Sequence, residues 1–249
     1  MAALISVYSG YIALSFLPPL VWLLFYLHED RHPEPKHLIL LTFGIGILVA
    51  LATAVAEVGL FARPPIFAGL FHRLAPLVLG YPAIVFSLIA LIEEYAKYLA
   101  VRYTVLNRPE FDEPVDAMIY MMTAALGFAA IENALFLVPA YERSFVGGFQ
   151  LTAQRFLGAN LLHALSSAFV GYDIARHHFS PWRRHAVFIG VITAGILHAL
   201  FNFFIITKDT VPASVLLVVL LLALMAVAVF VDFERLKRKP ISPAGGIPT

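Results

Sequence analysis

Residues 84–103 form an apolar stretch, typical of a helix, that carries Glu93, Glu94 and Lys97 in its middle. Asp, Glu and Lys at the centre of a membrane-spanning helix each cost roughly 2.5–3.5 kcal/mol on insertion scales. Lys97 lies three residues after Glu94 and four after Glu93, so its ammonium can pair with either carboxylate. Because adjacent residues project about 100° apart on a helix, one glutamate can pair with Lys97 while the other faces elsewhere. The rest of the chain must therefore supply polar groups for that second glutamate.

The composition of the 249 residues indicates a polytopic membrane protein, because 61% are hydrophobic and only 13% are charged, against about 25% charged in a soluble domain. We expect an all-α helix bundle, with one integral membrane domain over residues 1–249 and the polar motifs within residues 84–206. The absence of cysteine excludes disulfides and thiolate metal sites. A net charge of +1 argues against a nucleic-acid partner. Residues 1–10 lack a basic region, so we expect no cleaved signal peptide.

Hydropathy predicts about seven spans, at residues 4–27, 38–61, 82–106, 115–138, 152–175, 186–206 and 213–231. Residues 62–81 are mixed and indicate an interfacial or re-entrant segment. Pro82 suits the first turn of the third span, and Gly44 and Gly46 would allow close helix contact in the second. Residues 139–151 are expected to form a loop, and residues 235–249 a basic, flexible tail.

The distribution of basic residues predicts the orientation of the chain in the membrane. Loops one, three and five and the C-terminal tail carry eleven Arg and Lys residues, against five on the other side. The positive-inside rule therefore puts the N-terminus outside and the C-terminus in the cytoplasm. An eighth span would change this assignment.

Polar side chains recur in three further apolar segments. One holds Glu132 and Asn133, another holds His163, and a third holds His198 with Asn202 four residues later. Asn160, Ser166 and Ser167 lie three or four residues from His163 and so share its helix face. Each feature has a structural alternative: an ion pair at Lys97, or buried hydrogen bonds at Glu132 and the histidines.

Together these residues predict a hydrolytic site near the middle of the bilayer. A glutamate and two histidines are the ligand types of a catalytic zinc, with a further glutamate free as general base; Glu132, His163 and His198 are one such ligand set. Without a metal, one glutamate could activate water while histidine and Asn202 stabilise an oxyanion. We expect Lys97 to fix whichever of Glu93 and Glu94 is not the base.

Two weaker features have simpler explanations. Glu57 lies near the end of the second span, and we expect its side chain to snorkel to the interface. The acidic run over residues 112–116 is expected to form a solvated N-terminal cap for the fourth span.

Five ordered motifs resemble the PrsW family of intramembrane proteases: Glu93-Glu94-x-x-Lys97, Phe111-Asp-Glu-Pro-Val-Asp116, Gly127-Phe-Ala-Ala-x-Glu132-Asn133, His163-Ala-x-Ser166 and His198-Ala-x-x-Asn202-Phe203. Residues 30–36 are also similar, so the resemblance covers residues 30–203. The family is related to the CAAX prenyl endopeptidase and bacteriocin-processing superfamily. The resemblance implies catalytic roles for Glu93, Glu94, His163 and His198, with Glu132 and Asn202 beside them. It also implies site-one cleavage of membrane-bound anti-sigma factors in known members.

The sequence thus predicts an intramembrane endopeptidase of the cell membrane that acts on a membrane-anchored protein or peptide, with zinc as the candidate cofactor. Asn202 would orient His198 or donate to the tetrahedral intermediate, and Asn133 would support Glu132. An ion- or proton-coupled transporter also needs carboxylates at the midplane, and a non-catalytic scaffold that binds a partner helix is the other alternative. We find no internal repeat of the kind that many transporters have.

Overall fold

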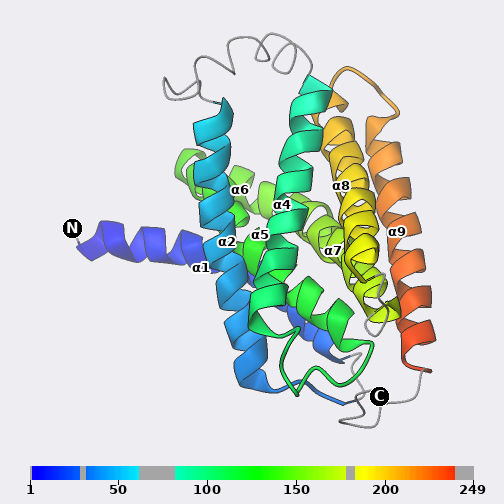
Figure 1. Cartoon of the computed structure of the whole chain (residues 1–249). Helices are drawn as coiled ribbons and strands as arrows, with labels where there is room; N and C mark the ends of the chain where they lie inside the picture. The colour runs from blue at the N-terminus through cyan, green and yellow to red at the C-terminus, as the bar shows by residue number, and fades with distance from the viewer. Residues whose placement is uncertain (1, 29–31, 62–81, 178–182, 239–249) are drawn as a thin grey trace, which may run out of the picture.

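The computed structural model describes the chain except for residues 1, 29–31, 62–81, 178–182 and 239–249. The described residues form α-helices and no strands, which confirms the all-α prediction (Figure 1). These helices are α1 (Ala2–His28), α2 (Lys36–Phe61), α4 (Pro82–Thr104), α5 (Asp116–Arg143), α6 (Phe145–Leu157), α7 (Ala159–Arg176), α8 (Arg183–Thr207) and α9 (Ser214–Leu236). The expected interfacial segment over residues 62–81 and the tail beyond residue 238 lie outside the described residues.

Five of these helices, α1, α2, α5, α8 and α9, are long and apolar enough to cross a membrane. Helices α4 and α7 do not belong to this group, because they carry much of the polar set that the sequence places inside the bundle. Their ionisable residues Glu93, Glu94, Lys97 and His163 are buried between helices rather than turned outward. The chain is therefore a multi-pass membrane protein, and the predicted orientation of its termini stays a prediction.

The expected span at residues 152–175 is wrong, because the chain breaks at Gly158 into α6 and α7. Gly158 has φ −100° and ψ −92°, outside the helical region. Its N–H closes α6 on the carbonyl of Gln154 at 2.8 Å, and its own carbonyl accepts the first bond of α7 from Leu162 at 2.9 Å. The expected loop at residues 139–151 is also helical, since α5 continues to Arg143 and α6 starts one residue after Ser144.

Helices α2 and α5 touch backbone to backbone at two glycines. A Cβ on Gly46 would overlap the Ala124 carbonyl, and a Cβ on Gly127 would overlap the Phe43 carbonyl. A Cβ on Gly44 would meet no atom within 4 Å. The predicted close helix contact is therefore correct for Gly46 and wrong for Gly44.

Helix α5 forms the middle of the bundle and contacts α1, α2, α4, α6 and α7. Every residue from Asp116 to Ala130 is buried. In Figure 1, α9 lies at one edge, while the first half of α1 leaves the bundle on the opposite side. Because α5 contacts helices on several sides, residues at its C-terminal half can meet α6 and α7 together.

The ends of two helices test further predictions. Helix α4 begins at Pro82, as expected for a proline in a first turn. The acidic run before α5 is not a solvated cap, because Asp116 is buried and accepts hydrogen bonds from the backbone N–H groups of Asp112 and Glu113 at 3.0 and 2.8 Å. Its carboxylate thus fixes the loop that precedes the helix.

The glycine contact predicts a difference between two neighbouring substitutions. Gly46→Ala should lower the melting temperature of the purified protein, because overpacking a closely packed contact typically costs about 1–3 kcal/mol. Gly44→Ala is the matched control on the same helix and should not destabilise, since its new methyl meets open space. Thermal melts in detergent that give equal stabilities would contradict the close contact.

Candidate active site

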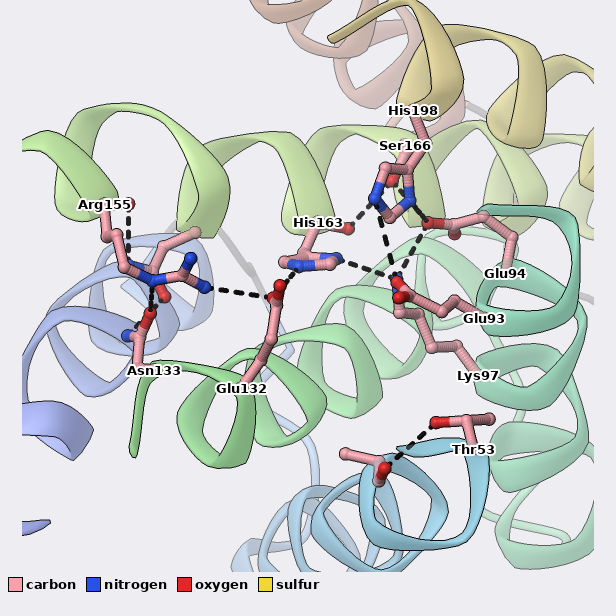
Figure 2. A network of polar contacts seen from close by, with 12 residues as sticks. Thr53, Glu93, Glu94, Lys97, Glu132, Asn133, Arg155, His163, Ser166 and His198 are labelled. Atoms are coloured by element: carbon pink, nitrogen blue, oxygen red, sulfur yellow. Dashed lines mark hydrogen bonds and ion pairs between the residues drawn. The ribbon is translucent and has the colours of Figure 1, made fainter. Parts of the chain in front are cut away.

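Most of the polar residues that the sequence singles out meet in one network, whose members come from α4, α5, α6, α7 and α8 (Figure 2). Helix α4 brings Glu93, Glu94 and Lys97, and α5 brings Glu132 and Asn133. The remaining helices contribute Arg155 from α6, His163, Ser166 and Ser167 from α7, and His198 from α8.

Glu94 is fully buried and fully hydrogen-bonded. Its Oε1 accepts from Lys97 Nζ at 2.8 Å and from Ser166 Oγ at 2.9 Å, and it lies 2.9 Å from His198 Nδ1. Its Oε2 accepts from Ser167 Oγ at 2.9 Å. Four donors from three helices therefore satisfy this carboxylate, which leaves it no free oxygen for a substrate.

Glu93 has the opposite environment. Its Oε2 is buried and has no hydrogen-bond partner among the described residues, and it lies 3.7 Å from both Lys97 Nζ and His198 Nε2. The side chain faces a cavity that Glu94 does not reach. The two adjacent carboxylates thus differ in the way that their angular separation predicts, with Glu94 paired to Lys97 and Glu93 turned toward the cavity.

His163 has both ring nitrogens engaged. Its Nδ1 lies 2.8 Å from Lys97 Nζ, and its Nε2 lies 2.5 Å from Glu132 Oε2. An ammonium can only donate hydrogen bonds, so we assign Nδ1 as the acceptor and Nε2–H as the donor to Glu132. Lys97 also lies over the Phe128 ring, 4.6 Å from its centroid.

His198 lies edge-on to His163, with ring centroids 5.0 Å apart. Because its Nδ1 faces the Glu94 carboxylate, we assign the proton to Nδ1, which leaves the Nε2 lone pair directed toward Glu93. The two histidines, which the sequence analysis assigned to one site, thus lie in contact. Asn202 does not hydrogen-bond His198 in the described part of the chain, since Glu94 takes Nδ1; instead Asn202 lines the cavity.

Arg155 is the member of the network that the sequence analysis missed. It pairs with Glu132, with 3.1 Å between Nη2 and Oε2, and its Nε donates to Asn133 Oδ1 at 2.6 Å. Asn133 in turn donates to Asn160 Oδ1 at 3.0 Å. Glu132 is thus paired with Arg155 and His163, whereas Asn133, which was expected to support it, binds Arg155 and Asn160. A single arginine inside an expected span was the signal that could have found this residue.

A cavity of about 650 Å³ opens beside the network. Glu93, Glu132, His163, His198 and Asn202 lie on its wall, while Glu94 and Lys97 lie behind that wall. Much of the remaining cavity wall is apolar and includes residues of α2 such as Ala50 and Ala54. Reactive side chains thus face a space within the bundle in which an apolar segment could be accommodated.

One group of side chains in this cavity has the spacing of a metal site. Glu93, His163 and His198 each offer one ligand atom, and the three atoms lie within 4.8 Å of one another. This set differs from the one expected from the sequence, in which Glu132 took the place of Glu93. Glu132 is instead bonded to Arg155 and His163.

The fold and the site together define a multi-pass membrane protein with a buried carboxylate–histidine centre. The family model described as "PrsW family intramembrane metalloprotease" matches residues 34–230. The chain therefore belongs to this family.

Curated relatives agree with this assignment. The chain is 27% identical to "Protease PrsW" of Geobacillus kaustophilus over 74% of each chain. It is 26% identical to "Protease PrsW" of Oceanobacillus iheyensis over 89% of this chain and 93% of that protein. The Bacillus subtilis "Protease PrsW" is 24% identical over 72% and 74% of the two chains. These relatives support a protease function, and no solved structure gives a significant match.

The burial of Lys97 predicts a large effect of its removal. Lys97→Met should strongly reduce the yield and melting temperature of folded protein, because breaking a buried ion pair by removing one partner costs about 3–5 kcal/mol. Lys208→Met removes an exposed lysine and is the matched control. Purification yields and melts that are the same for both variants would contradict the assigned pairing with Glu94.

Proposed function

We propose that the protein is an intramembrane endopeptidase that hydrolyses a peptide bond of a membrane-anchored protein, such as an anti-sigma factor. The observation that carries this proposal is the unpartnered Glu93 oxygen, which faces a cavity shared with His163 and His198. A carboxylate with a free lone pair beside imidazoles can take a proton from water. Membership of a protease family supports the same conclusion.

Glu93 is the proposed general base. A water molecule in the cavity would lose a proton to the Glu93 carboxylate and attack the scissile carbonyl, and Glu93 would then return the proton to the leaving amine. Glu94 and Lys97 would hold the base and the histidines in position, since neither lines the cavity. Asn202, on the cavity wall, would donate to the developing oxyanion.

Each of the two histidines has one ring nitrogen next to a carboxylate. Glu94 faces Nδ1 of His198 at 2.9 Å, and Glu132 faces Nε2 of His163 at 2.5 Å. Such carboxylate partners fix the tautomer and orientation of an imidazole and raise its basicity. We therefore assign Glu132 and Arg155 to the positioning of His163 rather than to contact with the substrate.

Zinc is the proposed cofactor, and the residues present fit it. Glu93 Oε2 has no hydrogen-bond partner in the described part of the chain, and His198 Nε2 lies 3.7 Å from it. His163 Nδ1 would exchange its bond to Lys97 for the ion. When bound, zinc would polarise the scissile carbonyl and activate water. A carboxylate has two oxygens, so Glu93 can hold an ion through one and accept a proton through the other.

The test of the proposed function uses the purified protein in liposomes with a single-span model substrate. A protease yields two shorter peptides, whereas a transporter moves an ion or proton and leaves the substrate intact. A scaffold binds the substrate without cutting it. We expect cut peptide, and intact substrate at all enzyme concentrations would overturn the proposal.

Because the two glutamates have different environments, we expect their glutamine variants to differ in stability and in cleavage rate. Glu93→Gln should fold with a melting temperature near that of the wild type and should lose about 10²–10⁴-fold in cleavage rate, because the base is removed. Glu94→Gln should also fold, with a lower melting temperature, since an amide cannot accept from all four donors. Cleavage at the wild-type rate by both single variants and the double variant would rule out this mechanism.

The ligand set predicts metal content. Purified wild-type protein should contain about one zinc per chain, and a chelator should abolish cleavage until zinc is restored. His198→Gln should lower the zinc content measured by elemental analysis, while His185→Gln, outside the network, should leave it unchanged. A metal-free preparation that cleaves at full rate would assign the chemistry to the side chains alone.

A further inference from the structure

We propose that Glu57 selects the substrate by binding a lysine or arginine side chain near the scissile bond. This inference rests on the proposed function, because it assigns a specificity site within the same cavity. The sequence led us to expect that Glu57 would snorkel to the membrane interface. Instead it lines the cavity that contains Glu93, His163 and His198.

One face of α2 forms this part of the cavity wall. Ala50, Thr53, Ala54 and Glu57 follow one another at helical spacing, and all four line the cavity. The Thr53 hydroxyl donates to the carbonyls of Val49 and Ala50 in its own helix, so its proton is not donated to Glu57. Glu57 is therefore the charged group on an otherwise small and uncharged face.

Among the described residues Glu57 forms no ion pair, unlike Glu93 and Glu132, the other two carboxylates on the wall. Its Oε1 is buried and accepts no hydrogen bond in the described part of the chain. By comparison, Glu132 pairs with Arg155 and His163. Glu93 has Lys97 and His198 nearby. A buried carboxylate oxygen without a donor is unfavourable until a ligand supplies one, so the substrate is the natural source of that donor.

The packing of α2 places this carboxylate where a substrate segment could pass. At Gly46, α2 touches the backbone of α5 and leaves no space. One and two turns further along, the small side chains of Ala50 and Ala54 border the cavity instead. A segment lying against this face would come close to Glu57, in the same cavity that Glu93 lines. Lysine and arginine have long stems that reach a charge from such a segment.

The donor should be cationic rather than neutral, because hydrogen bonds between a cation and a carboxylate are about twice as strong as neutral ones. A basic side chain would also give Glu57 a direct ion pair, which it does not form with any described residue. The proposed ligand is therefore a lysine or arginine within the apolar segment of the substrate, close to the bond that is cut.

Binding of labelled single-span peptides tests the proposal without requiring cleavage. The peptides carry Lys, Met or Glu at one position, moved stepwise along the span, and binding is measured by fluorescence anisotropy on the Glu93→Gln background in detergent. At one or two positions the Lys peptide should bind about tenfold more tightly than the Met peptide. This preference should vanish with Glu57→Gln and reverse toward the Glu peptide with Glu57→Lys.

Asp209→Asn is the matched control, because it removes an exposed carboxylate that does not line the cavity. It should keep the preference for the Lys peptide. If no position favours Lys, or if the preference survives Glu57→Gln, the specificity site is overturned even when the active protein cleaves these peptides. A Lys preference that depends on Glu57, with no cleavage by the active protein, would instead overturn the proposed function alone.

Discussion

The structure of the site depends on the burial of one carboxylate, Glu94. Taking an ionised carboxylate out of water is costly unless charges and hydrogen bonds compensate it. Here Lys97 supplies the charge, and Ser166, Ser167 and His198 supply the remaining contacts from α7 and α8. Satisfying Glu94 therefore requires three helices to adopt one arrangement, and that arrangement also positions both histidines beside the cavity.

Adjacent carboxylates with different partners explain how one helix can serve both structure and chemistry. Glu94 is directed into the packed interior, whereas Glu93, about 100° further around α4, faces the cavity. The residue that stabilises the bundle is thus held one position away from the residue that we propose reacts. Glu93 can remain without a full set of hydrogen bonds because the interactions of Glu94 stabilise the bundle that holds both residues.

The sequence predicted most of the site because charge inside an apolar segment has few explanations. Glu93, Glu94, Lys97, His163 and His198 could be grouped on that basis, and they meet in the structure. Arg155 and Glu57 could not be placed, since each was near a presumed helix end where a charge can reach water. The break at Gly158 was also missed, because hydropathy follows composition and is insensitive to the φ and ψ of one residue. The pairing of each histidine nitrogen with a carboxylate could be assigned only from the three-dimensional structure.

The short helix α6 has a consequence for how the bilayer acts on the site. Its exposed apolar residues Phe145, Val146 and Phe149 would contact lipid, while Arg155 at its other end pairs with Glu132 and through it contacts His163. Bilayers differ in thickness, and apolar surfaces shift to match them. The depth at which lipid acyl chains hold α6 is thus linked by two side chains to the orientation of one imidazole. Acyl-chain length would thereby become a physical variable of the candidate active site.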